Sequence, residues 1–224
     1  MEVYLFSLAS LQNEHMQQKA MKQLPESDRI YIEGIKSRKK RLTSLGGRML
    51  LQYIARMHGF EAFHLMYGEN GKPYFSDITD VFFNISHSEE YLILAWSHKE
   101  IGIDIEQMRN VLPKFPEKML SPTDFSCWQK HSDLEKKKCF FELWTRKESI
   151  IKLHGGSIFQ KAKEFSVSDG NQFLTCVGTP AAYFHTCQWN DYMISVRTLE
   201  EKADLSIQIV TLQEIIVKKL YMSF

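Results

Sequence analysis

The chain has 224 residues, of which 44% are hydrophobic and 25% are charged, and its formal net charge is +1. This is the composition of an ordinary globular protein with a sizeable core, and the near-neutral charge excludes bulk attraction to nucleic acid or to an anionic membrane. The four cysteines of the chain form no C-x-x-C motif, so we expect reduced thiols in a cytoplasmic protein rather than a zinc site or a disulfide framework.

Hydrophobic periodicity predicts the order strand, helices, strands twice along the chain. The first half is expected to contain a strand at 3–8, helices at 12–24 and 39–58, and β-like runs at 62–67, 81–86 and 91–97. The second half is expected to contain a strand at 101–106, helices at 113–130 and 134–154, and β-like runs at 164–168, 173–177 and 192–198. A site between two such halves is a common arrangement in enzymes that act on small molecules.

The hexapeptide Ile101–Glu106 is the most informative strand. Strand side chains alternate between faces, so the three isoleucines share a core face, and Gly102, Asp104 and Glu106 share the other. Two carboxylates on one face repel each other unless a cation or a proton relieves them, and oxygen ligands of this kind suit Mg²⁺. Gly102 is expected to leave room for a ligand. A solvated strand edge would carry the same pattern.

A second acidic position falls on a predicted helix. Ser132 and Glu135 form an S-x-x-E capping box, so a helix should begin there. Within it, Trp144, Glu148 and Lys152 are spaced four residues apart and share one face. Glu148 and Lys152 are therefore candidates for a site, although an exposed Glu–Lys pair has the same spacing.

Two polar segments lie upstream. Ser86 and His87 end a predicted strand without the G-x-S-x-G surroundings of a hydrolase nucleophile, so we expect them to donate hydrogen bonds, for which phosphate is a suitable acceptor. The segment Glu69–Pro73 has the composition of a turn and would hold Lys72 at a fixed place. A plain surface loop would look the same.

In chain order, these segments resemble the surfactin-type family of 4′-phosphopantetheinyl transferases. The segment Trp144–Gly155 fits the family pattern W-[ST]-x-K-E-[AS]-x-x-K-x-x-G at every position. The chain departs from the family at Thr43-Ser44, where an arginine should precede the hydroxyl residue, and at Asp124, where glutamate is usual. The matching segments are Gly71–Pro73, Phe83–Ser88, Gly102–Glu106 and Trp144–Gly155.

The resemblance implies an α+β fold of two similar α/β lobes, residues 1–100 and 101–224, with the active site in the cleft between them. It implies that Asp104, Glu106 and Glu148 hold Mg²⁺ against a diphosphate. It also implies a set of contacts to coenzyme A, mainly to its phosphates, from Lys72, Ser86, His87, Lys147 and Lys152. For the 3′-phosphate, Arg41 is the candidate that replaces the missing arginine, with Lys40 and Arg38 as alternatives.

The implied activity moves the 4′-phosphopantetheine group of coenzyme A to a serine of an apo acyl- or peptidyl-carrier protein and releases adenosine 3′,5′-bisphosphate. Glu148 and Lys152 are the candidate catalytic residues, and Glu148 would take the serine proton directly or through water. We expect a monomer with no nucleic-acid or membrane partner. A non-catalytic protein that binds coenzyme A or a carrier, and a different Mg²⁺-dependent nucleotide enzyme, remain as alternatives. The chain lacks the usual phosphate-binding glycine motifs of the latter.

The carrier is expected to dock beside Glu106, because its serine must reach the metal site. The segment Met108–Phe125 follows directly and combines apolar and basic residues, as partner surfaces often do. The same apolar residues could instead face the core of the protein. The expected contacts are Leu112, Phe115, Met119 and Leu120, with Arg109, Lys114 and Lys118 around them.

Overall fold

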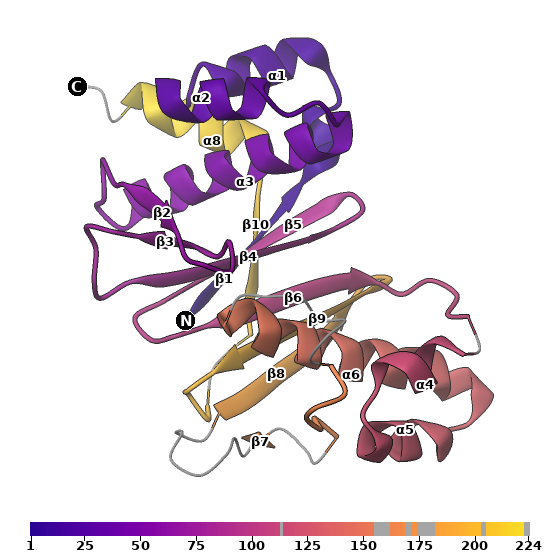
Figure 1. Ribbon diagram of the computed structural model, residues 1–224. Helices are drawn as coiled ribbons and strands as arrows, with labels where there is room; N and C mark the ends of the chain where they lie inside the picture. The colour runs from indigo at the N-terminus through magenta and orange to yellow at the C-terminus, as the bar shows by residue number, and fades with distance from the viewer. Residues whose placement is uncertain (113, 155–161, 169–171, 174–181, 203–204, 222–224) are drawn as a thin grey trace.

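The computed structural model describes residues 1–112, 114–154, 162–168, 172–173, 182–202 and 205–221 (Figure 1). It has a mixed α+β fold with two four-stranded sheets and a small hairpin. Among the described helices, none combines the length and apolar character needed to cross a membrane.

The first sheet has the strand order β10-β1-β5-β4. Its strands are β10 (Ile207–Val210), β1 (Glu2–Ser7), β5 (Tyr91–Ser97) and β4 (Phe82–Ser88). β1 is antiparallel to β5 and parallel to β10, so the last strand of the chain pairs with the first. The hairpin beside this sheet consists of β2 (Leu65–Tyr67) and β3 (Pro73–Phe75).

The second sheet has the strand order β6-β9-β8-β7 and is antiparallel throughout. Its strands are β6 (Gly102–Gln107), β9 (Tyr192–Thr198), β8 (Ala182–Trp189) and β7 (Gln172–Phe173). The predicted strand at 101–106 is confirmed. The predicted strand at 164–168 is wrong, because Val167 and Ser168 donate their main-chain N–H groups to a side chain, Asp124, and not to a strand. Residues 174–177 of another predicted run lie outside the described residues.

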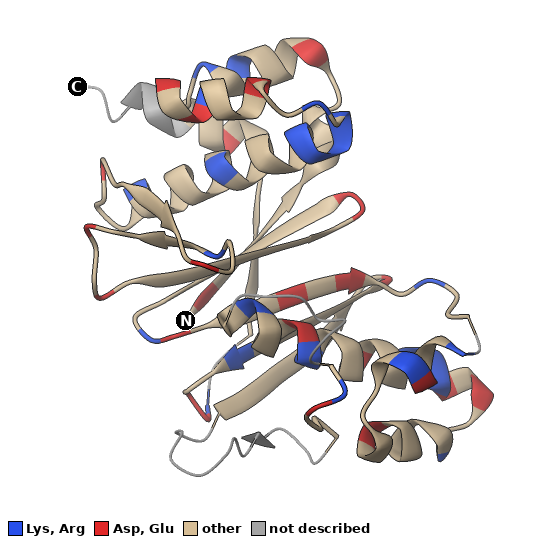
Figure 2. Ribbon diagram, viewed as in Figure 1, with Lys and Arg blue, Asp and Glu red and all other residues tan. Residues whose placement is uncertain are grey.

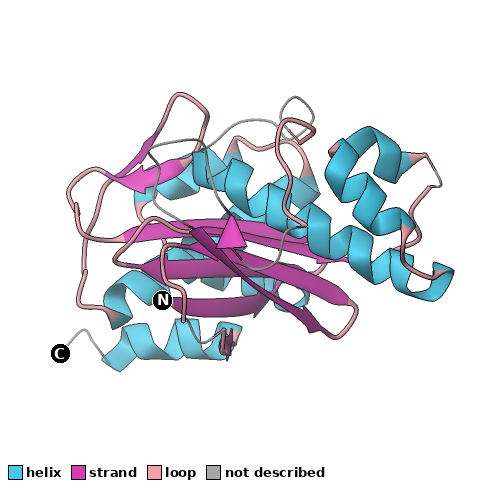
Figure 3. Cartoon of the chain, turned by 90° about the horizontal axis from the view of Figure 1, so that it is seen from below, coloured by secondary structure: helices cyan, strands magenta, loops and turns pink. Residues whose placement is uncertain are grey.

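A long helix covers each sheet. The first sheet packs against α3 (Arg38–Met57), with η1 (Leu8–Leu11), α1 (Glu14–Met21), α2 (Glu26–Glu33) and α8 (Leu212–Tyr221) nearby (Figures 1 and 3). The second sheet packs against α6 (Asp133–His154), followed outward by α4 (Phe115–Met119) and α5 (Pro122–Gln129). The single helix expected at 113–130 is thus two helices, because Ser121 caps a new helix that has Pro122 in its first turn.

A third apolar core lies between the two sheets. Val3 and Leu5 of β1 point into it, while Tyr4 and Phe6 point to the α3 side, as strand alternation requires. The three isoleucines of Ile101–Ile105 also belong to this inner core and are fully buried. The other face of β6 is therefore turned toward α6, and this places Asp104 and Glu106 beside that helix.

Candidate functional site

The edges of the two sheets meet where β4 runs beside β6. The two strands are not paired, and side chains of β4 replace the missing main-chain partners of β6. The N–H groups of Ile103, Ile105 and Gln107 donate to Asn84 Oδ1 at 2.9 Å, Ser86 Oγ at 3.4 Å and Ser88 Oγ at 3.1 Å. The polar residues that end β4 thus hold the two sheets together.

The same serines also orient the two carboxylates of β6. Ser86 Oγ donates to Asp104 Oδ1 at 2.8 Å, and Ser88 Oγ donates to Glu106 Oε2 at 2.8 Å. Lys152 of α6 reaches this point as well, with its Nζ 2.5 Å from both Ser86 Oγ and Asp104 Oδ1. Of the predicted donors, Ser86 and Lys152 therefore contact a carboxylate of the protein itself.

Glu148 joins the group electrostatically. We call Asp104, Glu106, Glu148 and Lys152 the acidic site; Figure 2 shows acidic positions on β6 beside acidic and basic positions on α6. Burial first, and then the charge of Asp104, raises the pKa of Glu106 and raises that of Glu148 to about 8. Burial alone would lower the pKa of Lys152, but the carboxylates raise it overall. One ammonium group therefore lies among three carboxyl groups, and a second positive charge would stabilise the ionised form of these carboxyl groups.

The acidic site has the donor chemistry of a magnesium site, although its side chains are not arranged around an ion. Within the described part of the chain, no group of three or more His, Cys, Asp or Glu side chains is arranged to hold a metal ion. The donors nevertheless fit Mg²⁺ in kind, because all are carboxylate oxygens. Asp104 Oδ2 is buried and accepts no hydrogen bond from the described residues, so one oxygen ligand is available. In the structure, the Lys152 ammonium group supplies the positive charge at the other oxygen.

A close contact between β6 and α6 fixes this geometry. A Cβ atom on Gly102 would lie 2.0 Å from the main-chain oxygen of Ser149 and 3.2 Å from Leu153 Cβ. Only glycine allows the strand and helix to approach so closely. The expectation that Gly102 leaves room for a ligand is thus wrong, since α6 occupies that space.

Lys72 and His87 lie at the border of the acidic site. Lys72 Nζ donates to the Leu153 main-chain oxygen at 2.8 Å, so the turn before β3 is attached to the last turn of α6. Burial lowers the pKa of Lys72. His87 is exposed at the end of β4, and partial desolvation of its ring, followed by the charge of Lys152, lowers its pKa.

Lys147 is separated from the acidic site. Its side chain is fully buried, with Nζ 2.6 Å from Asp124 Oδ2 and 2.8 Å from the main-chain oxygen of Ala162. Burial alone would raise the pKa of Asp124, but the Lys147 ammonium group lowers it overall. The geometry gives no support to a contact between Lys147 and a ligand. Sequence reasoning missed this buried pair because nothing in the spacing of the two residues indicates it.

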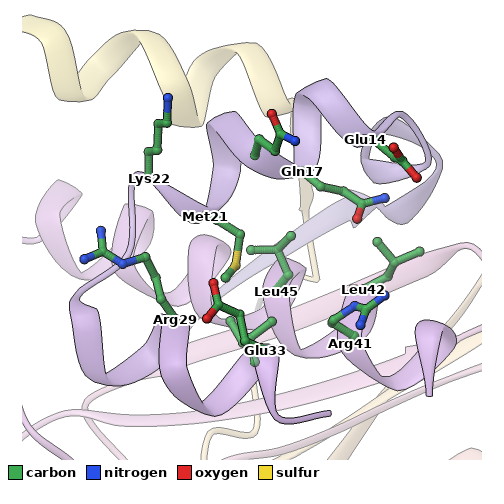
Figure 4. A pocket seen from close by; sticks show the side chains of 11 residues that line it. Glu14, Gln17, Met21, Lys22, Arg29, Glu33, Arg41, Leu42 and Leu45 are labelled. Atoms are coloured by element: carbon green, nitrogen blue, oxygen red, sulfur yellow. The ribbon is translucent and has the colours of Figure 1, made fainter. Parts of the chain in front are cut away.

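Arg41 is also separated from the acidic site. It lines a pocket of about 600 Å³ between α1, α2 and α3 (Figure 4). Met21, Leu42 and Leu45 form apolar walls, and charged residues stand around them. The residues of the acidic site, Lys72 and His87 do not line this pocket.

Comparison with known proteins shows a match over the part of the chain that contains the acidic site. Residues 100–197 match the family described as the 4′-phosphopantetheinyl transferase superfamily. The chain is therefore similar to this superfamily over the region that carries the site. The matched region contains β6, α6 and β9, and therefore all four residues of the acidic site.

Several curated proteins are similar to this chain over longer stretches. A 4′-phosphopantetheinyl transferase of Bacillus subtilis is 36% identical over 128 residues, which is 56% of this chain and 57% of the relative. The 4′-phosphopantetheinyl transferase gsp of Aneurinibacillus migulanus is 29% identical over 154 residues, or 68% and 64% of the two chains. The 4′-phosphopantetheinyl transferase AcpT of Salmonella typhi is 36% identical over 128 residues, or 54% and 62%. The chain thus spans 57% to 64% of the lengths of these relatives.

Proposed function

We propose that the protein transfers the 4′-phosphopantetheine group of coenzyme A to a serine of an apo acyl- or peptidyl-carrier protein. The observation that carries this proposal is the acidic site: three carboxyl groups from β6 and α6 converge around one lysine inside the segment that matches the superfamily. A protein that only binds a nucleotide has no need for three neighbouring carboxyl groups in which burial and the charge of Asp104 raise the pKa of Glu106 and of Glu148.

The reaction forms a bond between the serine oxygen of the carrier and the phosphorus that bears pantetheine. The bond from that phosphorus to the oxygen of the leaving group breaks, and adenosine 3′,5′-bisphosphate departs. The serine proton passes to Glu148, directly or through one water. Lys152 and Lys72 are proposed to bind the phosphates, where their positive charges reduce the repulsion that an incoming oxygen meets.

Asp104, Glu106 and Glu148 are the residues proposed to hold magnesium. When bound, magnesium supplies positive charge next to the diphosphate and stabilises the leaving group. Ser86 and Ser88 orient the carboxylates through the hydrogen bonds described above, and exposed His87 is proposed to contact a phosphate. Because the structure separates Arg41 and Lys147 from this site, neither is included in the proposed mechanism.

Three further proposals accompany the activity. The division into lobes at residues 1–100 and 101–224, with coenzyme A in the cleft between them, is supported by the two helix-covered sheets, except that β10 and α8 of the second segment pack with the first sheet. The protein is also proposed to be a monomer and to act in the cytoplasm, and the cytoplasmic location is consistent with the free cysteines at positions 127, 139 and 187. The carrier is proposed to dock on the segment after β6, at positions that remain exposed, including Leu112 and Lys118.

Intact-mass spectrometry tests the proposed activity. The protein is incubated with coenzyme A, Mg²⁺ and a panel of apo-carriers, and we expect one carrier to gain the mass of one phosphopantetheine group. Excess chelator should stop the transfer, and added Mg²⁺ should restore it. Full transfer in chelator would contradict the role of the metal. Binding of coenzyme A without a mass change on any carrier would favour a non-catalytic binding protein.

A further inference from the structure

Arg197 of β9 is a buried arginine with unused hydrogen-bond donors. The residue is only 5% exposed, and its Nε and Nη1 atoms are buried without a hydrogen-bond acceptor. A guanidinium group removed from water in this way is costly unless an anion is bound to it. Arg146 provides the contrast within the same layer: it is 6% exposed and donates to Glu142, Thr186 and Val167.

The strand register gives the position of Arg197. It lies opposite Gly102 in the β6–β9 pair and on the same face as Ser195, whose hydroxyl is 2.7 Å from that of Thr145 in α6. Arg197 therefore faces the α6 layer. Since a Cβ atom on Gly102 would lie only 3.2 Å from Leu153 Cβ, Arg197 stands near the last turn of that helix.

A second cation lies at the same helix end. Lys72 Nζ donates to the main-chain oxygen of Leu153. Burial lowers the pKa of Lys72, and the nearby positive charge of Arg197 lowers it further. Burial likewise lowers the pKa of Arg197. Glu100 is the acidic residue whose charge acts on both, and it is exposed. The carbonyl end of a helix attracts cations, but Nε and Nη1 of Arg197 donate no hydrogen bond to it.

We propose that Arg197 and Lys72 form an anion-binding site for a phosphate group at the C-terminal end of α6. A guanidinium group offers phosphate two parallel donors, and the lysine adds a point charge. This inference rests on the proposed function for the source of the phosphate, which is coenzyme A. Gly102 and Asp104 are two residues apart on β6, about 7 Å, so a ligand with several phosphates can reach both this site and the acidic site.

The first test uses stability in the absence of ligand. Arg197→Met removes the charge and keeps most of the volume, so its melting temperature should equal or exceed that of the wild type in an amine buffer without phosphate or sulfate. Arg146→Met is the matched control, and its melting temperature should fall because it removes hydrogen bonds that are made. An equal fall for Arg197→Met would overturn the proposal, because it would show that Arg197 is already paired in the folded protein.

The second test uses binding, measured calorimetrically without a carrier. Arg197→Met should bind coenzyme A at least about tenfold more weakly than the wild type. Arg197→Lys keeps the charge and loses the fork, and it should fall between the two; affinity equal to that of the wild type would contradict the assignment. Unchanged binding of coenzyme A and of inorganic phosphate in Arg197→Met would also overturn it.

Two other ligands identify the source of the phosphate. If the 3′-phosphate is bound, Arg197→Met should bind dephospho-coenzyme A as tightly as the wild type does. If the diphosphate is bound, the loss should be equal for both coenzymes. If only the binding of inorganic phosphate is lost, the site serves a separate phosphate ligand. These binding measurements contain no carrier, so their outcome does not depend on whether the protein catalyses the transfer. Likewise, unchanged binding in the Arg197 variants would not contradict the proposed transfer reaction.

Discussion

Lys152 Nζ lies 2.5 Å from Asp104 Oδ1, and this pair joins α6 to the edge of the second sheet. Asp104 is 1% exposed, so the ammonium group is the main counter-charge that a buried carboxylate receives from the described residues. A divalent cation at Asp104 would therefore act beside this lysine, and the two positive charges would compete for the same carboxyl groups.

Asp104→Asn removes the carboxylate for which Lys152 and a divalent cation would compete, and it should also abolish catalysis. We expect the transfer rate to fall at least about a hundredfold, because an amide cannot balance the charge of the cation. In the wild type, Mg²⁺ should raise the melting temperature, and in Asp104→Asn this effect should disappear. Asp80→Asn, at an exposed position, is the control and should behave as the wild type. Transfer at the wild-type rate in Asp104→Asn would remove this residue from the proposed site.

Glu148→Gln should change how stability depends on pH. The pKa of Glu148 is raised to about 8 in the folded protein, against a usual value of 4.5, so the folded state binds the extra proton between these values. The wild type should therefore lose stability as the pH rises from about 5 to 8. Without a divalent cation, the variant should be more stable than the wild type at pH 8 to 9, by about 1 kcal/mol or more. Denaturant unfolding at a series of pH values measures this, and identical profiles would contradict the assignment.

Lys147→Met should lower the free energy of unfolding by about 3 to 5 kcal/mol, because it leaves Asp124 buried without its counter-ion. Lys130→Met, at an exposed position, should have little effect. The pKa of Asp124 is below its usual 3.8, so the contribution of the pair is present above about pH 4 and is lost in stronger acid. Chemical denaturation of the two variants tests this. If Lys147→Met is as stable as the wild type but binds coenzyme A weakly, the result would support the predicted contact between Lys147 and coenzyme A and contradict the structural role.

Lys118→Glu should raise the apparent KM for the carrier and leave that for coenzyme A nearly unchanged, and the effect should fade at high salt. Lys118 is exposed at the surface of α4, and carriers of this kind are expected to be acidic. Lys130→Glu makes the same change of charge at the residue that follows α5 and serves as the control. Equal carrier kinetics in both variants would place the docking surface elsewhere.

Phe115→Ala tests stability rather than docking. Phe115 lies 5.7 Å from the ring of Phe140 and 5.8 Å from that of Trp144, while Met119 and Leu120 are buried. The prediction that these three contact a carrier is therefore not supported, because they complete the core under α4. We expect a loss of about 1 to 3 kcal/mol in the free energy of unfolding. Leu112, which is 76% exposed, remains available to a partner.

Local pattern was sufficient for the acidic strand and the long helices. The alternation in Ile101–Glu106 placed the isoleucines in the core and the carboxylates on the other face, and the capping box of Ser132 marked the start of α6. Pattern could not show that Ser86 and Ser88 would bind these carboxylates, because β4 and β6 meet only in three dimensions. The short helix α2 and the strands β8 and β10 were missed for a related reason, since packing against distant elements decides their form.

The parallel pairing of β1 with β10 has a consequence for synthesis of the chain. Val3 lies opposite Ile207, so the chain must be synthesised past Ile207 before the first sheet acquires β10. Until then the free edge of β1 exposes unpaired main-chain groups, which invite pairing with other chains. Contacts of such long range also slow folding. The nascent protein should therefore depend on chaperones more than its modest size suggests, and this dependence should ease once residue 210 has emerged.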